Sequence, residues 1–345
     1  MTENTPLGSG YVLQRKIGSG AMGSVWLAHD RDGKEVACKL LRSEFADDPA
    51  VVAKFVGERT VLVRVRHPHV VAMHDLVVDG GRLGIVMDLV RGSDLRAGLR
   101  PVGTLPPAEV ARVGAGVAAG LAAVHAQGIV HRDVKPENIL IDTTVAPSQP
   151  RVSDFGLARI AESSAATRSS MAIGTPNYMA PELADGHIAT PAADVYSLGI
   201  VLYEMACGVT PFEGGTQLAT IRRHGDALPG RPGGIPEPLW EVITDCTAKD
   251  PGQRPTASAL AERLSSLVPT LASEPAAPRL AVPPAPVELR LTTPHTAVLP
   301  TAAVAAAASG NAASAGLQAD HPVAATPQPI PVVKRKRRVI PAVAG

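Results

Sequence analysis

The first ninety residues place apolar side chains in short alternating runs, the period of half-buried β-strands. Three such runs predict strands, at 11–17, 23–29 and 36–41. The polar turn 30–33 joins the last two, and Asp79-Gly80-Gly81 joins a further pair, 72–78 and 84–90, into a hairpin. Residues 45–65 instead repeat their apolar positions at helical spacing. A β-rich unit with one helix is therefore predicted.

After Gly92 the apolar residues recur mainly with the period of an α-helix. Five segments are predicted helices: 107–127, 192–207, 216–223, 238–246 and 256–267. The apolar run 113–124 is only about a dozen residues long, short of the roughly twenty that span a bilayer, which indicates a buried helix. The pattern predicts an α+β fold with a small antiparallel β lobe (11–90) and a larger, mainly helical lobe (91–267).

The two ends of the chain lack these patterns. Residues 1–10 are expected to form a short loose leader. From 268 onward Pro, Ala and Thr dominate and Phe, Trp and Tyr are absent, so apolar burial cannot offset a chain entropy of ~1–2 kcal/mol per residue. We expect a disordered Pro/Ala-rich linker at 268–333, and at 334–345 a basic cluster (334–338) followed by an apolar end.

Composition narrows the function classes. The formal net charge of +1 provides no strong one-signed field, so no nucleic-acid partner is expected. Cys38, Cys207 and Cys246 lie far apart without CxxC or Cys/His spacing, which favours neither disulfides nor a zinc site. The first thirty residues show no secretory signal pattern. These features predict a protein of the reducing cytoplasm.

The first chemical signal is Gly18-Ser19-Gly20-Ala21-Met22-Gly23-Ser24-Val25, a GxGxxGxV run between two predicted strands. Glycines let a backbone approach phosphate oxygens closely. In a dinucleotide-binding fold a similar loop opens a helix, whereas here a strand follows. The run alone is weak evidence for a phosphate-binding loop.

The second signal is Lys39 in Val36-Ala37-Cys38-Lys39, sixteen residues after Gly23. Ala37 and Lys39 share one face of a strand, so a small residue can lie against a flat base while the ammonium reaches phosphates. Glu58, on the predicted helix that follows, is expected to form an ion pair with Lys39. On their own, such residues are more often solvated surface charges.

Three further motifs follow: His131-Arg132-Asp133-Val134-Lys135-Pro136-Glu137-Asn138, Asp154-Phe155-Gly156 and Ala180-Pro181-Glu182. They resemble the catalytic loop, the metal-binding loop and the end of the activation segment of eukaryotic-type protein kinases. The resemblance covers residues 11–267 and is strongest to bacterial Hanks-type serine/threonine kinases of the actinobacterial kind. It implies the bilobal protein-kinase fold and a non-specific serine/threonine protein kinase that also phosphorylates itself.

The resemblance implies a role for each catalytic position. Asp133 is expected to orient the substrate hydroxyl and accept its proton, and Lys135, typical of the serine/threonine branch, to steady the γ-phosphoryl group of ATP. Asn138 and Asp154 would supply oxygen ligands for two Mg²⁺ ions, for which Mn²⁺ is an alternative. Each acidic residue alone is compatible with a surface charge, so the assignment depends on all of the motifs occurring in register.

The resemblance also implies an adenine pocket. Met87 matches the residue at its back, and Asp88 to Val90 match the hinge whose backbone binds the adenine edge. The other expected nucleotide contacts are Ile17, Gly18, Ser19, Gly20, Gly23, Val25, Ala37, Lys39 and Leu140. Core packing requires the same apolar side chains, so the sequence does not separate the two roles.

Three residues match positions that brace the large lobe in this family. Glu182 and Arg254 match a buried ion pair, and Asp194 matches the residue that anchors the catalytic-loop backbone. Tyr196 stands where eukaryotic members commonly have tryptophan.

A switch is expected in the activation segment. Arg132 precedes Asp133, where an arginine can pair with a phosphate on that segment. Thr167 and Ser169 best match the autophosphorylated hydroxyls of bacterial relatives, which predicts activation in trans. A polar loop is the alternative interpretation of these hydroxyls.

Partners and location remain expectations. They are protein substrates, a phosphothreonine-binding domain that docks on phosphorylated sites, and a transient kinase dimer. The basic cluster 334–338 predicts either contact with anionic lipid, a membrane anchor if the sequence continues, or a solvated end. Two rival functions stay open: a scaffold without catalysis, against which the intact motifs argue, and a small-molecule kinase, which Lys135 and Gly174-Thr175 disfavour.

Overall fold

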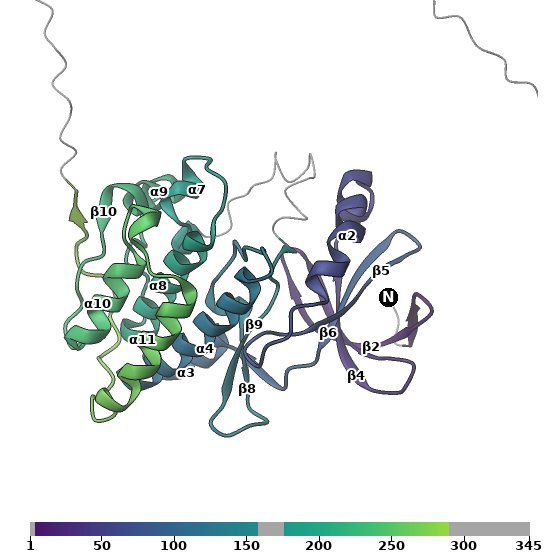
Figure 1. Ribbon diagram of the computed structural model, residues 1–345, viewed down its shortest axis with the longest axis horizontal. Coiled ribbons are helices and arrows are strands. Elements are labelled where there is room, and N and C mark those ends of the chain that lie inside the picture. Colours follow the sequence, from purple (N-terminus) through teal and green to yellow (C-terminus); the bar gives the residue numbers. More distant parts are fainter. Residues whose placement is uncertain (1–3, 158–175, 290–345) are drawn as a thin grey trace, which may run out of the picture. The chain divides into compact units, whose positions relative to one another are not determined.

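The computed structural model describes residues 4–157 and 176–289, which Figure 1 colours along the chain. Six strands form an antiparallel sheet in the order β1-β2-β3-β4-β6-β5. They are β1 (Thr5–Leu7), β2 (Tyr11–Gly20), β3 (Gly23–His29), β4 (Glu35–Leu41), β5 (Met73–Asp79) and β6 (Arg82–Asp88). The predicted strands of the small lobe, including the hairpin, are thus confirmed.

Residues 5–7 form a strand, which corrects the expectation of a loose leader at 1–10. β1 pairs with the start of β2, with Leu7 opposite Tyr11 and Thr5 opposite Leu13. Leu7 is fully buried and belongs to the same apolar cluster as Leu13 and Trp26. The backbone of β1 adds ladder hydrogen bonds to the sheet, and Leu7 adds apolar burial.

Two helices, not the single one predicted, follow β4: α1 (Ser43–Ala46) and α2 (Pro49–Leu62). The break is local, because Pro49 lacks the N–H that a helix interior needs but suits a first turn. Asp48 caps α2 by accepting a hydrogen bond from Ala50 N at 2.9 Å. α2 packs against β5 at the side of the sheet (Figure 1).

The larger lobe is mainly helical, as predicted. In the described ranges its helices are α3 (Leu95–Val102), α4 (Pro107–His125), α7 (Pro181–Ala184), α8 (Pro191–Cys207), α9 (Gln217–Asp226), α10 (Glu237–Cys246) and α11 (Ala257–Thr270). It also contains the antiparallel sheet β7 (Gly92–Asp94), β8 (Ile139–Asp142) and β9 (Gln149–Val152), and the 3-10 turns η1 (Pro136–Asn138), η2 (Pro176–Tyr178) and η3 (Pro251–Gln253). The sequence did not reveal α3 or this sheet, because such short elements carry little periodicity.

Helix α4 packs against both α8 and α11 (Figure 1). Within the described ranges it is the one helix long and apolar enough to cross a membrane, and 67% of that stretch is buried in the fold. The expectation of a buried helix is therefore confirmed. Its approach to the small lobe requires glycine: a Cβ at Gly120 would lie 2.4 Å from the carbonyl oxygen of His69, and one at Gly116 would lie 2.8 Å from the His69 ring.

Residues 271–289, here called the C-terminal strap, continue from α11 along the large lobe. Thr104 Oγ1 donates a hydrogen bond to Ala277 O at 2.7 Å, and Leu280 N donates one to Cys207 O at 2.9 Å. Near its end, β11 (Val287–Glu288) pairs antiparallel with β10 (Ala227–Leu228).

The strap corrects the predicted start of disorder at 268, which is wrong for 268–289. Leu271 and Ala277 are buried within the fold. Backbone hydrogen bonds and small apolar contacts attach the segment, and neither is evident from a Pro/Ala-rich composition. The predictions made for 290–345 lie outside the described residues.

Candidate active site

The glycine run forms the tip of the β2–β3 hairpin. Gly18 lies opposite Val25, Ser19 opposite Ser24, and Gly20 opposite Gly23. Gly23 has φ +154°, and a Cβ there would lie 1.9 Å from the carbonyl oxygen of Leu40 on the adjacent strand. Only glycine fits at this position, because the β3 backbone passes directly against β4.

Strand β4 presents Ala37 and Lys39. Lys39 lies opposite Val25, and Ala37 lies opposite Met87 of β6. The Lys39 ammonium is largely buried, and its Nζ lies 2.7 Å from Asp154 Oδ2. A buried ammonium needs such a partner, since an isolated charge would be costly. The structure therefore joins Lys39 of the small lobe to the Asp-Phe-Gly motif.

The described partner of Lys39 is Asp154, and the predicted ion pair between Lys39 and Glu58 stays a prediction. Glu58 lies on α2 and is half-buried, while the Lys39 ammonium contacts Asp154. The Asp154 backbone has φ +62°. The sequence predicted Asp154 as a metal ligand and gave no sign that it also contacts Lys39.

Asp133 is surrounded by side chains from its own motif. Lys135 Nζ donates to both carboxylate oxygens, at 2.9 and 2.7 Å. Asn138 Nδ2 donates to the Asp133 carbonyl oxygen at 2.7 Å and to its Oδ2 at 2.9 Å. The loop thus assembles a carboxylate, an ammonium and an amide within hydrogen-bond distance, through the turn η1.

Asp194 on α8 fixes the backbone of this loop. Its side chain is almost fully buried and accepts hydrogen bonds from His131 N at 2.8 Å and from Arg132 N at 2.7 Å. The His125 ring lies 2.7 Å from the same carboxylate. A buried carboxylate with three partners holds a backbone rigidly, because a displacement would break its hydrogen bonds and leave the charge unpaired in an apolar interior.

His131 and Ser153 connect the catalytic loop to Asp154, a role that the sequence motifs did not indicate. The His131 ring lies 2.8 Å from the carbonyl oxygen of Ser153, and Ser153 N donates to Asn138 O at 2.9 Å. Asn138, directly before β8, and Asp154, two residues after β9, are therefore held close together where these two paired strands meet the catalytic loop. The position of His131 as the first residue of the catalytic-loop motif was the one sequence signal that could have indicated this role.

The predicted adenine contacts come from β2, β3, β4, β6 and β8 and from the connection that follows β6. Val25, Ala37, Met87, Val90 and Leu140 belong to one apolar cluster, whereas Ile17 is 40% exposed. Core packing accounts for the buried members equally well, so their nucleotide role stays a prediction.

Glu182 and Arg254 form the expected buried pair. Arg254 Nη1 and Nη2 donate to Glu182 Oε1 and Oε2 at 2.6 and 2.8 Å. The Arg254 guanidinium also lies 4.8 Å from the centre of the Tyr196 ring. A bidentate pair of this kind ties α7 to the segment after α10.

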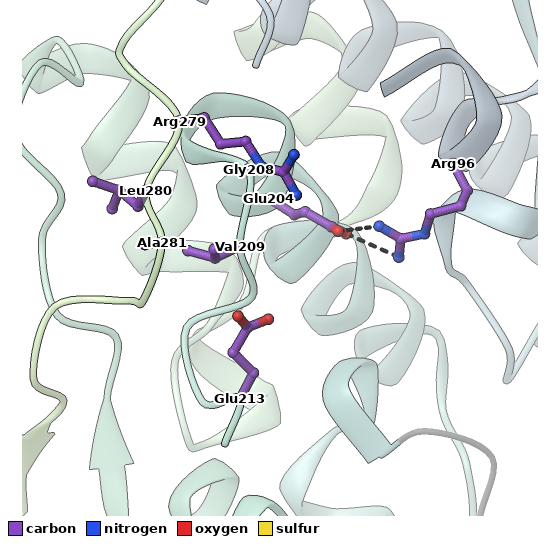
Figure 2. Close-up of a pocket in the computed structure, with 8 residues that line it drawn as sticks. All are labelled: Arg96, Glu204, Gly208, Val209, Glu213, Arg279, Leu280 and Ala281. Atoms are coloured by element: carbon purple, nitrogen blue, oxygen red, sulfur yellow. Dashed lines mark hydrogen bonds and ion pairs between the residues drawn. The ribbon is translucent and has the colours of Figure 1, made fainter. Parts of the chain in front are cut away.

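A further polar network was missed in the sequence. Arg96 on α3 pairs with Glu204 on α8, as Figure 2 shows, and also contacts Tyr178 and Glu137. Burial raises the pKa of Tyr178, and its hydroxyl donates to Glu204 at 2.6 Å. The network joins η1 of the catalytic loop to η2, which directly precedes the Ala-Pro-Glu motif.

The regulatory positions are only partly described. Arg132 has φ +70° and donates its backbone N–H to Asp194. Thr167 and Ser169 lie outside the described residues, so their role stays a prediction.

A divalent metal fits the oxygen donors present. In the described ranges no group of three His, Cys, Asp or Glu side chains is arranged for a metal ion. Asn138 turns its amide nitrogen toward Asp133, which directs its carbonyl oxygen elsewhere, and Asp154 uses Oδ2 for Lys39. One amide oxygen and one carboxylate oxygen, both hard donors, suit Mg²⁺ completed by phosphate and water ligands.

Comparison with known proteins matches residues 11–264 to the protein kinase domain model. The chain is similar to the serine/threonine-protein kinases PkaA (45% identity, covering 75% of this chain and 50% of PkaA) and PkaB (47%, covering 77% and 65%) of Streptomyces coelicolor. It thus spans about half to two thirds of the length of these curated relatives. The crystal structure of the Mycobacterium tuberculosis PknI kinase domain is similar at 26% identity with a TM-score of 0.61, covering 77% of this chain and 99% of that domain.

Proposed function

The chain belongs to the protein kinase domain family, and on that premise we propose that it transfers the γ-phosphoryl group of ATP to serine and threonine hydroxyls of proteins, itself included. The observation that carries the proposal is the convergence of Lys135 and Asn138 on the Asp133 carboxylate, on a loop that Asp194 fixes. That arrangement serves the alignment of a hydroxyl with a phosphoryl group.

Each polar group has a defined task in this proposal. Asp133 orients the attacking hydroxyl and accepts its proton, while the Lys135 ammonium beside it lies near the phosphoryl oxygens and offsets their growing charge. Lys39 orients the remaining phosphates from the small lobe. Phosphoryl transfer requires little covalent chemistry from the protein, so positioning and charge compensation account for most of the rate.

Asn138 and Asp154 would hold the metal, Mg²⁺ in preference to Mn²⁺, through their remaining oxygens. The ion held by these two residues would supply positive charge that offsets the charge of the nucleotide phosphates. The chain's own contribution is to keep these two ligands in place through His131 and Ser153.

The switch and the partners complete the proposal. Phosphorylation of Thr167 or Ser169 in trans would supply a phosphate for Arg132, and phosphorylated sites would bind phosphothreonine-recognition domains. A kinase dimer would serve the trans reaction. We place the domain in the cytoplasm, with anionic lipid as a further contact of the basic cluster 334–338.

The test is labelling with radioactive ATP and magnesium, with Asp133→Asn as the matched variant. We expect label on serine and threonine in the wild type and at least a hundredfold less in Asp133→Asn, of the order that general-base catalysis contributes, about 10²–10⁴. Binding of a fluorescent ADP analogue serves as the folding control. Nucleotide binding without label in the wild type would reject catalysis and favour a scaffold.

A further inference from the structure

The Asp88 carboxylate, at the end of β6, lies between two basic side chains from different elements. His74 Nε2 on β5 is 2.9 Å from Asp88 Oδ1. Arg151 Nη1 on β9 is 3.3 Å from Asp88 Oδ2. Because β5 and β6 belong to the six-stranded sheet and β9 to the sheet of the large lobe, this carboxylate connects the two lobes.

The three side chains are partly shielded from solvent. Their exposed fractions are 28% for His74, 30% for Asp88 and 23% for Arg151. Arg151 is also approached from its other side by Asp142, whose Oδ2 lies 3.4 Å from Arg151 Nε. Solvent screens a charge pair in such a site less than one at the open surface. The Arg151 guanidinium is also oriented by two carboxylates, Asp88 and Asp142.

The backbone beside Asp88 is held at both ends of a short connection. Asp88 N donates to Ala72 O at 2.9 Å. Three residues further on, the carbonyl oxygen of Arg91 accepts hydrogen bonds from Thr143 N and Thr143 Oγ1, both at 3.0 Å. The Arg91 side chain reaches Glu35 in a pair that is well exposed, at 64% and 38%. Residues 89 and 90 therefore lie between two fixed points.

We propose that the Asp88 carboxylate is a positioning group for the nucleotide: with His74 and Arg151 it fixes the backbone of residues 88–90 in the conformation that binds the adenine edge. The inference rests on the proposed function, since it assigns the nucleotide to this backbone. A connection that is ordered before binding loses less conformational entropy when the adenine base binds. In this role the Asp88 carboxylate acts through the backbone of residues 88–90 and not through contact with ATP.

The experiment compares Asp88→Asn, Arg151→Met and the double variant in the full chain. Either single substitution is expected to raise the KM for ATP about fivefold to tenfold, equivalent to about 1–1.4 kcal/mol, because one charged partner is lost. The kcat should change by less than about twofold, since the catalytic loop is untouched. The double variant should be no worse than Asp88→Asn alone, because Asp88→Asn already removes the carboxylate charge with which both His74 and Arg151 pair.

Two controls separate positioning from folding. Asp88→Glu retains the charge and should bring the KM back to within about twofold of the wild type. Glu35→Gln removes the exposed pair with Arg91 and should leave the KM unchanged. The dissociation constant of a fluorescent ADP analogue should follow the KM values, and thermal unfolding shows which variants are folded.

The outcomes are decisive in each arm. If the wild type phosphorylates its substrate but neither Asp88→Asn nor Arg151→Met changes the KM, the inference is wrong. Additive effects in the double variant would overturn it as well. If Asp88→Asn does not fold, Arg151→Met and Asp88→Glu still test the pair. A wild type that binds nucleotide without phosphorylating anything would instead refute the proposed function.

Discussion

The catalytic loop (131–138) and the C-terminal strap (271–289) are both irregular segments of the large lobe, but they are attached in opposite ways. The loop depends on one buried carboxylate, Asp194, which accepts hydrogen bonds from two consecutive backbone amides and approaches His125. The strap has no comparable residue. Its attachments are spread along the segment as backbone hydrogen bonds, small buried side chains and a two-residue β-ladder.

The difference corresponds to what each segment does. A site for phosphoryl transfer needs atoms placed to a fraction of an ångström, and a buried charge with several partners resists small displacements. A segment that covers a lobe needs only net stabilisation, which many weak contacts provide. We therefore expect loop substitutions to reduce catalysis and strap substitutions to reduce stability.

The largest effect is expected for Asp194→Asn. The amide cannot accept from all three donors, and its NH₂ group faces donors in place of an acceptor. We expect the free energy of unfolding to fall by about 2–4 kcal/mol and kcat to fall about a hundredfold, because the loop backbone shifts. Urea unfolding and phosphorylation assays measure the two quantities.

The matched control is Asp245→Asn on α10, where the carboxylate pairs with Arg263 and is 51% exposed. It should change stability by less than about 1 kcal/mol. A normal kcat in folded Asp194→Asn would show that the loop is held by other contacts.

The next effect is expected from removing the strap. A chain ending at Thr270 loses the burial of Leu271 and Ala277 and the hydrogen bonds of Leu280 and Thr104. We expect a loss of about 2–5 kcal/mol in unfolding free energy, with kcat within about twofold when assayed well below the unfolding temperature.

A chain ending at Leu289 is the control for this truncation, because it keeps every described contact of the strap, and the shorter chain should be less stable than this control. If the shorter chain were equally stable, the strap would contribute no net stabilisation. If it were stable but inactive, the division between the two segments would be wrong.

The smallest effect is expected for Thr104→Val. The substitution keeps the side-chain shape but leaves the carbonyl oxygen of Ala277 without its 2.7 Å hydrogen bond. The urea midpoint should correspond to a loss of about 1 kcal/mol, with unchanged kcat. Thr244→Val, which removes an exposed bond to Glu241 O within the same helix, should change stability much less. A loss as large as that of the truncation would mean that one bond, not many, holds the strap.

The contrast also explains which features the sequence made predictable. The strands of the small lobe alternate apolar and polar residues, and the catalytic positions lie within short motifs, so both are local. The partner of Lys39 is not local: Asp154 is 115 residues away, and its distance from Lys39 depends on how the two lobes meet. The strap was missed because its hydrogen bonds come from the backbone, and composition says nothing about backbone partners.

Helix breaks show the same limit on a smaller scale. The apolar spacing of 45–65 continues through Pro49, so periodicity alone predicted one helix where α1 and α2 form. The proline and the preceding Asp48 were the available signal. The sequence carried no such signal for Arg96, because a single arginine on an eight-residue helix does not indicate that it reaches both Glu204 and Glu137.

Helix α4 bears on how this chain can change over generations. Gly116 and Gly120 face His69, in the connection between α2 and β5, with no space for a methyl group. An alanine at Gly120 would have to be accommodated by His69, encoded some fifty codons earlier, and one at Gly116 by both His69 and Pro150, so single mutations there should be purged and viable ones should arise together with a second change. The seam between the lobes is thus a place where the evolutionary histories of two distant gene segments are coupled.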